Sequence, residues 1–166
     1  MRNATSHAGM ESAAGLVAQR FADFYRLEYD RAVRLAWLLT GSQAAAEDVV
    51  QDAMTGVYRL FERLDAPGAY LHRAVVNGAR SRSRDERRQR ERVARLEREG
   101  AAVDVDDAGL LELISGLPYR QRVVIVGRYW AGWSEADIAR ALGCRRGTVK
   151  LLASRALNRL RQELEP

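Results

Sequence analysis

The chain of 166 residues is long enough for one ordinary domain or for two small helical ones. Its residues are 47% hydrophobic, and no apolar run reaches the roughly 18 residues of a membrane span, so a soluble protein is expected. The single cysteine, Cys144, excludes an intramolecular disulfide, and with only His7 and His72 beside it we expect no metal site and no cofactor.

The net charge of +5 is distributed unevenly along the chain. Residues 118–161 carry nine arginines and Lys150 against only Glu135 and Asp137, a net charge of +8. Residues 80–100 carry +4, and residues 101–117 carry −4. Such a basic segment is typical of a protein that binds the phosphate backbone of nucleic acid, although charge alone leaves open an ordinary solvated face.

Helical periodicity predicts an all-α fold. A first helix is expected over about 17–40, with a break near Asp30 left open, and Gly41-Ser42 ends it and caps the next. The second helix is expected over 43–64, where Val50, Val57, Tyr58 and other apolar residues share one face. After a loop at 65–68, a third helix is expected over 69–99, and its second half is a run of charges.

These elements predict two small helical domains joined by a flexible linker. A disordered N-terminus is expected over 1–16. This segment lacks the apolar core of a signal peptide, so a cytoplasmic location is expected. The first domain would cover 17–99. The linker would cover 100–108, where aspartates stand among small residues, and the second domain would cover 109–166.

The second domain contains the pattern of a helix-turn-helix over 135–154. Ala139 is the small residue at the helix contact, and Gly143 tolerates positive φ at the turn. Ser134 is a candidate N-cap, with Asp137 in the position of a capping box. The offsets that should be buried carry Ile138, Leu142, Cys144, Val149 and Leu152, so we expect Cys144 to pack in the core.

The second helix of this motif should begin near Arg146 and present polar and basic side chains to duplex DNA. Arginine suits guanine edges, whereas Thr148, Lys150 and Arg155 are expected to hold backbone phosphates, which position a helix without specifying sequence. An upstream helix from Pro118 to about Trp130 adds further phosphate contacts, with Tyr129 and Trp130 expected in the core. The candidate DNA-binding residues are Arg120, Arg122, Arg145, Arg146, Thr148, Lys150, Ser154 and Arg155.

In the first domain, Asp48, Gln51 and Asp52 stand at i, i+3 and i+4 and share one face of the second helix. They form a polar stripe opposite the apolar face. On spacing alone, an ordinary solvated face is the favoured interpretation.

Two motifs nevertheless resemble a known family. AEDVVQDAM (46–54) resembles the polymerase-docking segment of region 2 in bacterial extracytoplasmic-function sigma factors, and LPYRQRVVIVGRYWAGWSEADIARALGCRRGTVKLLASRALNRLR (117–161) resembles their region 4. The resemblance covers nearly all of 21–164, and LHRAVVNGARSR together with GCRRGTVKLLASRALNRLR is most similar to the actinobacterial SigE-like branch.

The resemblance implies that Asp48, Gln51 and Asp52 contact the clamp helices of the RNA polymerase β′ subunit. It implies that the loop at 64–68 and the helix from Ala69 meet the melted minus-10 element, and that the helix from Arg146 reads the minus-35 element. An anti-sigma factor is a further partner that the family often has. Capture of a melted strand needs basic side chains along its backbone, and the candidates are Arg59, Arg63, Asn77, Arg80 and Arg84.

The main alternative is an autonomous operator-binding regulator with a LuxR-type output domain, since those also end in a helix-turn-helix containing a GTVK-like string. Against it stands the N-terminal half, which shows no phosphoacceptor pattern and instead a polar stripe followed by a basic helix. An enzyme is a third reading, and a distant one, because the sequence has no glycine-rich phosphate loop and no cluster of metal ligands.

Overall fold

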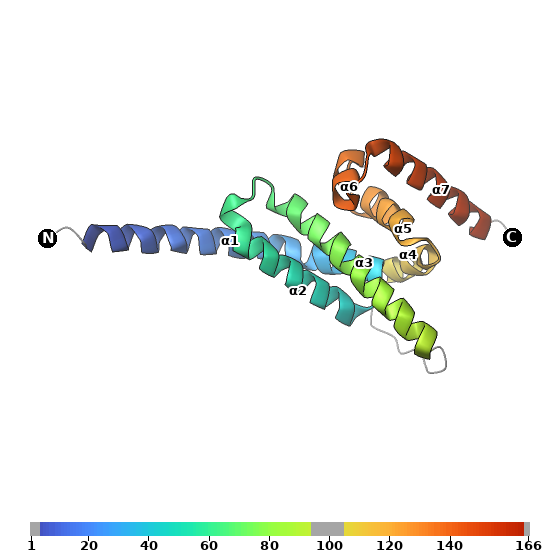
Figure 1. The fold of residues 1–166 in the computed structure, drawn as a ribbon, viewed down its shortest axis with the longest axis horizontal. Coiled ribbons are helices and arrows are strands. Elements are labelled where there is room, and N and C mark those ends of the chain that lie inside the picture. The colour runs from blue at the N-terminus through green and yellow to red at the C-terminus, as the bar shows by residue number, and fades with distance from the viewer. Residues whose placement is uncertain (1–3, 94–104, 165–166) are drawn as a thin grey trace.

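The computed structural model describes the backbone of residues 4–93 and 105–164, and the side chains of 15–82, 109 and 111–164. All regular elements within these ranges are helical, as the sequence predicted (Figure 1).

The N-terminal domain is a bundle of α1 (Ala4–Thr40), α2 (Gln43–Leu60) and α3 (Pro67–Val93), with a 3₁₀ turn at Phe61–Arg63 after α2. The expected turn between α1 and α2 is confirmed. Gly41 has φ +76°, and the Ser42 hydroxyl accepts a hydrogen bond from the Ala45 amide. The core of the bundle includes Leu38, Val50, Val57, Leu71 and Val75, all fully buried.

Helix α1 differs from the expectation in length. It begins at Ala4 instead of near Val17, and it continues through Asp30 without a break. No proline interrupts residues 4–40, and alanine has the highest helix propensity, so a single long helix is locally consistent. The third helix reaches Val93, and the remainder of its expected length, 94–99, lies outside the described residues.

The C-terminal domain contains α4 (Val105–Ser115), α5 (Tyr119–Ile125), α6 (Glu135–Leu142) and α7 (Arg146–Leu164). Helix α4 begins inside the segment that we expected to be linker. The expected helix from Pro118 to Trp130 is divided, since its second part, Val126–Trp130, is π-helical. A Cβ on Gly127 would lie 2.8 Å from Trp133 Cε3, so the absence of a side chain lets Trp133 pack against this π turn.

The two domains are packed against each other (Figure 1). The main contact is between α3 and α6, and the C-terminal end of α1 also meets the C-terminal domain. One continuous cluster of buried side chains extends from Leu38 and Val76 of the first domain to Ile114 and Val123 of the second.

Candidate nucleic-acid interface

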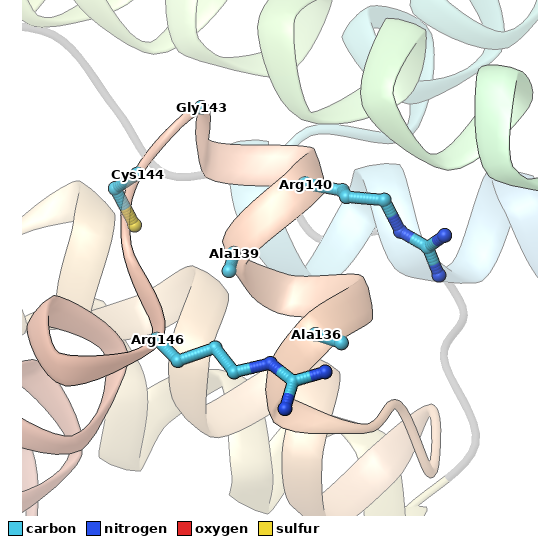
Figure 2. A pocket seen from close by; sticks show the side chains of 6 residues that line it. All are labelled: Ala136, Ala139, Arg140, Gly143, Cys144 and Arg146. Carbon is cyan, nitrogen blue, oxygen red and sulfur yellow. The ribbon is translucent and has the colours of Figure 1, made fainter.

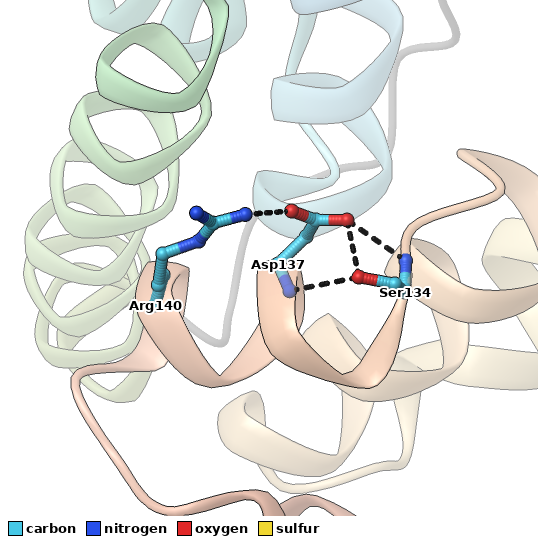
Figure 3. A network of polar contacts seen from close by, with 3 residues as sticks. All are labelled: Ser134, Asp137 and Arg140. Carbon is cyan, nitrogen blue, oxygen red and sulfur yellow. Dashed lines mark hydrogen bonds and ion pairs between the residues drawn. The ribbon is translucent and has the colours of Figure 1, made fainter. Parts of the chain in front are cut away.

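The helix-turn-helix is formed by α6, a short turn and α7. Ser134 caps α6, because its hydroxyl accepts from the Asp137 amide at 3.2 Å while the Asp137 carboxylate accepts from the Ser134 amide at 3.1 Å (Figure 3). Arg140 also donates to Asp137. The Ser134 hydroxyl also donates to the Asp137 carboxylate. This hydrogen bond is the largest cause that holds the pKa of Asp137 below its ordinary value, and the one from Arg140 is the next. The predicted capping box is therefore confirmed.

The turn and the interior of the motif are also as predicted. Gly143 has φ +60°, the left-handed conformation that glycine adopts without strain. Ile138, Ala139 and Val149 are buried in one cluster, and Leu142, Cys144 and Leu152 are partly buried against it. Cys144 thus packs as a small apolar side chain. This packing sets the direction of α7 relative to α6.

The basic side chains of helix α7 are all exposed. Val149, Ala153, Ala156 and Leu160 form its buried face. Of the candidate residues on and before α7, all are exposed except Thr148, which is partly buried; the exposed ones are Arg145, Arg146, Lys150, Ser154 and Arg155. This face can bind phosphates and reach base edges.

A hollow lies beside the turn, lined by small residues and two arginines (Figure 2). Arg146 extends from the start of α7 alongside α6 toward Ala136, whereas Arg140 points away on the other side of α6 (Figure 2). Ala136, Ala139 and Gly143 line the hollow with a methyl group or no side chain at all. Small residues with an arginine beside them suit the close approach of a phosphate backbone.

Two carboxylates, those of Asp137 and Glu135, form ion pairs with part of this positive charge among the described residues. Glu135 forms ion pairs with two cations: Arg128 Nη1 lies 3.7 Å from its Oε1, and Lys150 Nζ lies 4.0 Å from its Oε2. Lys150 remains 69% exposed in its side chain, so this weak pair leaves it available to a stronger anion such as phosphate.

Arg122 and Tyr119 make hydrogen bonds to backbone carbonyls inside the protein. Arg122 donates from Nη1 to the Leu39 carbonyl at 2.9 Å and from Nη2 to the Ser115 carbonyl at 2.8 Å, which places its guanidinium at the C-terminal ends of α1 and α4. Tyr119 donates its hydroxyl to the Val76 carbonyl of α3 at 2.5 Å, and burial raises the pKa of this phenol. In this arrangement Arg122 joins the two domains. Arg120, the other upstream candidate, is partly buried.

The polar stripe of α2 lies on the open face of its helix. Asp48, Gln51 and Asp52 are exposed, whereas Val49, Val50 and Ala53 between them are buried. Asp48 pairs with Arg82 of α3 at 3.3 Å, and Gln51 donates to the Tyr29 hydroxyl at 3.4 Å. The stripe is thus an exposed polar surface with two carboxylates, and it contacts α1 and α3.

The basic candidates of the first domain fall on two elements. Arg59 and Arg63 are exposed near the end of α2 and in the 3₁₀ turn, and Asn77 and Arg80 are exposed on α3. The side chain of Arg84 lies outside the described residues. Arg59 and Arg63 lie near the loop that joins α2 to α3, whereas Asn77 and Arg80 lie farther along α3, where Gly78 packs against Val49 of α2.

Three features of the structure were not anticipated. His72 of α3 stacks on Trp133 of the other domain with ring centroids 4.5 Å apart. Tyr58, grouped with the apolar face of α2, is 58% exposed and packs edge-on against Phe21. Tyr129 is likewise 60% exposed instead of buried. No local signal marks the His72 contact, because its partner is distant in the chain.

No cluster of three or more metal-ligating side chains occurs among the described residues. Among the same residues, no helix is long and apolar enough to cross a membrane.

Comparison with known proteins identifies both domains. The family profile described as Sigma-70 region 2 matches residues 24–89, and that described as Sigma-70, region 4 matches residues 108–160.

Similar proteins extend over most of the chain. The RNA polymerase sigma-E factor of Streptomyces avermitilis is 33% identical over 154 residues, which cover 87% of this chain and 85% of that protein. The ECF RNA polymerase sigma factor SigM of Mycobacterium tuberculosis is 34% identical over 158 residues, covering 89% of this chain and 80% of SigM.

Solved structures share the fold. The sigma factor RpoE of Bartonella quintana, in complex with the anti-sigma factor NepR, matches with a TM-score of 0.72 and 25% identity over 89% of this chain and 98% of that one. CnrH, in complex with the cytosolic domain of CnrY, matches with a TM-score of 0.69 and 23% identity over 92% of this chain and 94% of that one.

Proposed function

Because the chain belongs to the extracytoplasmic-function sigma factors of bacterial RNA polymerase, we propose that it acts through two separate surfaces, the acidic stripe of α2 and the basic face of α7. The stripe of Asp48, Gln51 and Asp52 binds the β′ clamp helices of core polymerase. The exposed face of α7 then binds the minus-35 element.

The observation that carries this proposal is the opposite charge of two exposed helix faces in different domains. An acidic stripe repels DNA and suits a basic protein partner, whereas a basic helix-turn-helix suits DNA. A protein with both can hold a polymerase at a promoter. Its action requires binding and no chemistry, so we expect no catalysis by the chain itself.

The melted minus-10 strand is assigned to the first domain. Arg59 and Arg63 near the loop between α2 and α3, and Asn77 and Arg80 farther along α3, are exposed and would give a single strand polar and basic contacts, while Tyr58 beside Arg59 offers an exposed ring. Arg84 remains a candidate on the basis of the sequence alone, because its side chain lies outside the described residues.

A charge reversal tests the docking surface. Asp48→Arg/Asp52→Arg should lose binding to core polymerase, measured as competition with a labelled wild-type chain, while the basic face of α7 is unaltered. The matched control is Asp23→Arg/Asp30→Arg, which makes the same change of charge at exposed positions of α1 and should still compete. Equal loss in both variants, or in neither, would contradict the assignment.

The same competition separates this function from the alternative of an autonomous operator-binding regulator. A regulator of that kind would bind a duplex site tightly without polymerase and would not compete for core. The family matches over both domains favour the sigma factor.

We place the protein in the cytoplasm, where polymerase and promoters are. An anti-sigma factor is a further proposed partner, since the similar RpoE was solved bound to NepR.

A further inference from the structure

The outward face of α7 carries an exposed leucine among polar and basic residues. Leu151 is 50% exposed. It is two residues from Val149 on one side and from Ala153 on the other, both buried, and two residues correspond to about 200° around a helix. Leu151 therefore points directly away from the core of the domain, in the second turn of the helix.

The side chains around Leu151 define what it would meet. Ser154 and Arg155, three and four residues later on the same face, are exposed, and Lys150 is exposed beside it. Exposed basic groups around a single apolar side chain do not suit a protein core. They suit a surface whose rim binds phosphates and whose centre touches the floor of the major groove.

Gly147 is a second, independent indication that a binding partner approaches the backbone of α7 closely. It lies one turn before Leu151 on the same face and is exposed. A Cβ there would meet nothing within 4 Å, and its φ is not among the positive values of Gly41, Gly132 and Gly143. Neither internal packing nor backbone conformation therefore requires glycine, although glycine within a helix is unfavourable.

We propose that Gly147 and Leu151 together form an apolar reader of the minus-35 element, in which the bare backbone at Gly147 lets α7 approach the bases and Leu151 contacts the C5-methyl group of a thymine. This rests on the proposed function, in which α7 enters the groove, and it names a base that the face selects. Thymine is the only base with a methyl group in the major groove, and apolar side chains recognise it there.

The test removes only that methyl group. Holoenzyme, assembled from the full chain and core polymerase, first selects duplexes from a pool with a randomised upstream element. Each thymine of the selected element is then replaced singly by deoxyuridine, which keeps base pairing. One replacement should weaken binding about fourfold, the equivalent of about 0.8 kcal/mol for one apolar carbon group.

Matched variants assign the effect to Leu151. Leu151→Ser should bind the thymine and deoxyuridine duplexes equally, because its side chain no longer contacts the methyl group. Leu157→Ser alters an exposed leucine of the same helix on another side, and it should keep the fourfold preference. Gly147→Ala should raise the Tm of the free chain by roughly 2–4 °C and yet weaken binding to the selected duplex.

The possible outcomes distinguish a failure of this inference from a failure of the proposed sigma-factor function. If holoenzyme selects an upstream sequence but no deoxyuridine replacement affects binding, or if Leu151→Ser keeps the preference, the reader is wrong and the sigma function stands. If the holoenzyme selects no upstream sequence, the proposed function and the reader are both wrong.

Discussion

His72 lies where the domains meet, stacked on Trp133, and burial is the largest cause that lowers the pKa of its imidazole. Glu28 and Asp137 oppose this shift, whereas Arg31 adds to it. Since the pKa is below its ordinary value of 6.5, the unfolded chain binds more protons than the folded one as the pH falls through and below that value. The stability associated with neutral His72 is therefore complete above about pH 6.5 and declines in acid.

We accordingly expect the free energy of unfolding to fall between about pH 7 and pH 5.5, and His72→Gln to remove most of that fall. Urea denaturation at several pH values measures it. His7→Gln serves as the control and should keep the wild-type dependence. A pH dependence that is identical in His72→Gln and the wild type would show that this imidazole is not the group responsible.

At single residues, sequence reasoning succeeded where the chemistry is local. Cys144 was predicted to pack and does, because its offset in the motif determines its burial. Arg122 was predicted to bind DNA, whereas in the structure it donates to carbonyls at the ends of two helices. A guanidinium suits phosphates and helix C-termini equally, and only the tertiary fold decides which it meets.

The capping box of α6 gives a prediction at the scale of one element. Ser134→Ala removes the acceptor for the Asp137 amide and should lower the free energy of unfolding by about 1 kcal/mol. Chemical denaturation measures the change. Ser154→Ala, at an exposed position within α7, should stay within about 0.5 kcal/mol of the wild type. Equal effects of the two substitutions would argue that the cap contributes nothing.

The π turn gives a second prediction for an element. Gly127→Ala would place a Cβ 2.8 Å from Trp133 Cε3 and 3.2 Å from Ile138 Cγ1, so we expect a loss of about 1–3 kcal/mol of stability. Gly15→Ala in α1, where a Cβ meets nothing within 4 Å, should be neutral or stabilising. Thermal unfolding of both variants checks this, and a Gly127→Ala protein as stable as Gly15→Ala would contradict the packing.

Helix ends were predictable where a residue determines them. Gly41, Ser42, Ser134 and Gly143 mark termini through capping and positive φ, which depend on neighbours in sequence. The early start of α1, the start of α4 within the expected linker and the π turn were not anticipated. The π turn depends on Trp133 packing against Gly127, a contact that periodicity does not encode.

At the scale of the whole molecule, two domains with separate sequence signatures form one packed unit. Tyr119 donates to Val76 across the contact and Arg122 donates to Leu39, while α3 packs against α6. The sequence predicted the number of domains and their helical class but not this contact, since each partner lies many residues away from the other. Helix α3 carries minus-10 candidates and α6 belongs to the helix-turn-helix, so both candidate DNA-binding domains contribute to it.

We predict that Tyr119→Phe/Arg122→Ala loosens the packed arrangement. The two substitutions remove one neutral and one charged hydrogen bond between the domains, of the order of 1 and 2 kcal/mol respectively. Small-angle X-ray scattering of the free chain should show a larger radius of gyration, with helical circular dichroism unchanged. An unchanged radius would mean that the α3 and α6 contact suffices on its own.

The central claim is that this chain directs core polymerase to promoters through one acidic and one basic surface. Its most direct measurement is run-off transcription by core polymerase from a promoter library, with the wild-type chain, with Asp48→Arg/Asp52→Arg, and with Arg145→Ala/Arg146→Ala. We predict specific transcripts with the wild-type chain only. Asp48→Arg/Asp52→Arg should lose binding to core polymerase, whereas Arg145→Ala/Arg146→Ala should keep it. A wild-type chain that yields no specific transcript, while binding a duplex site tightly without polymerase, would contradict the account.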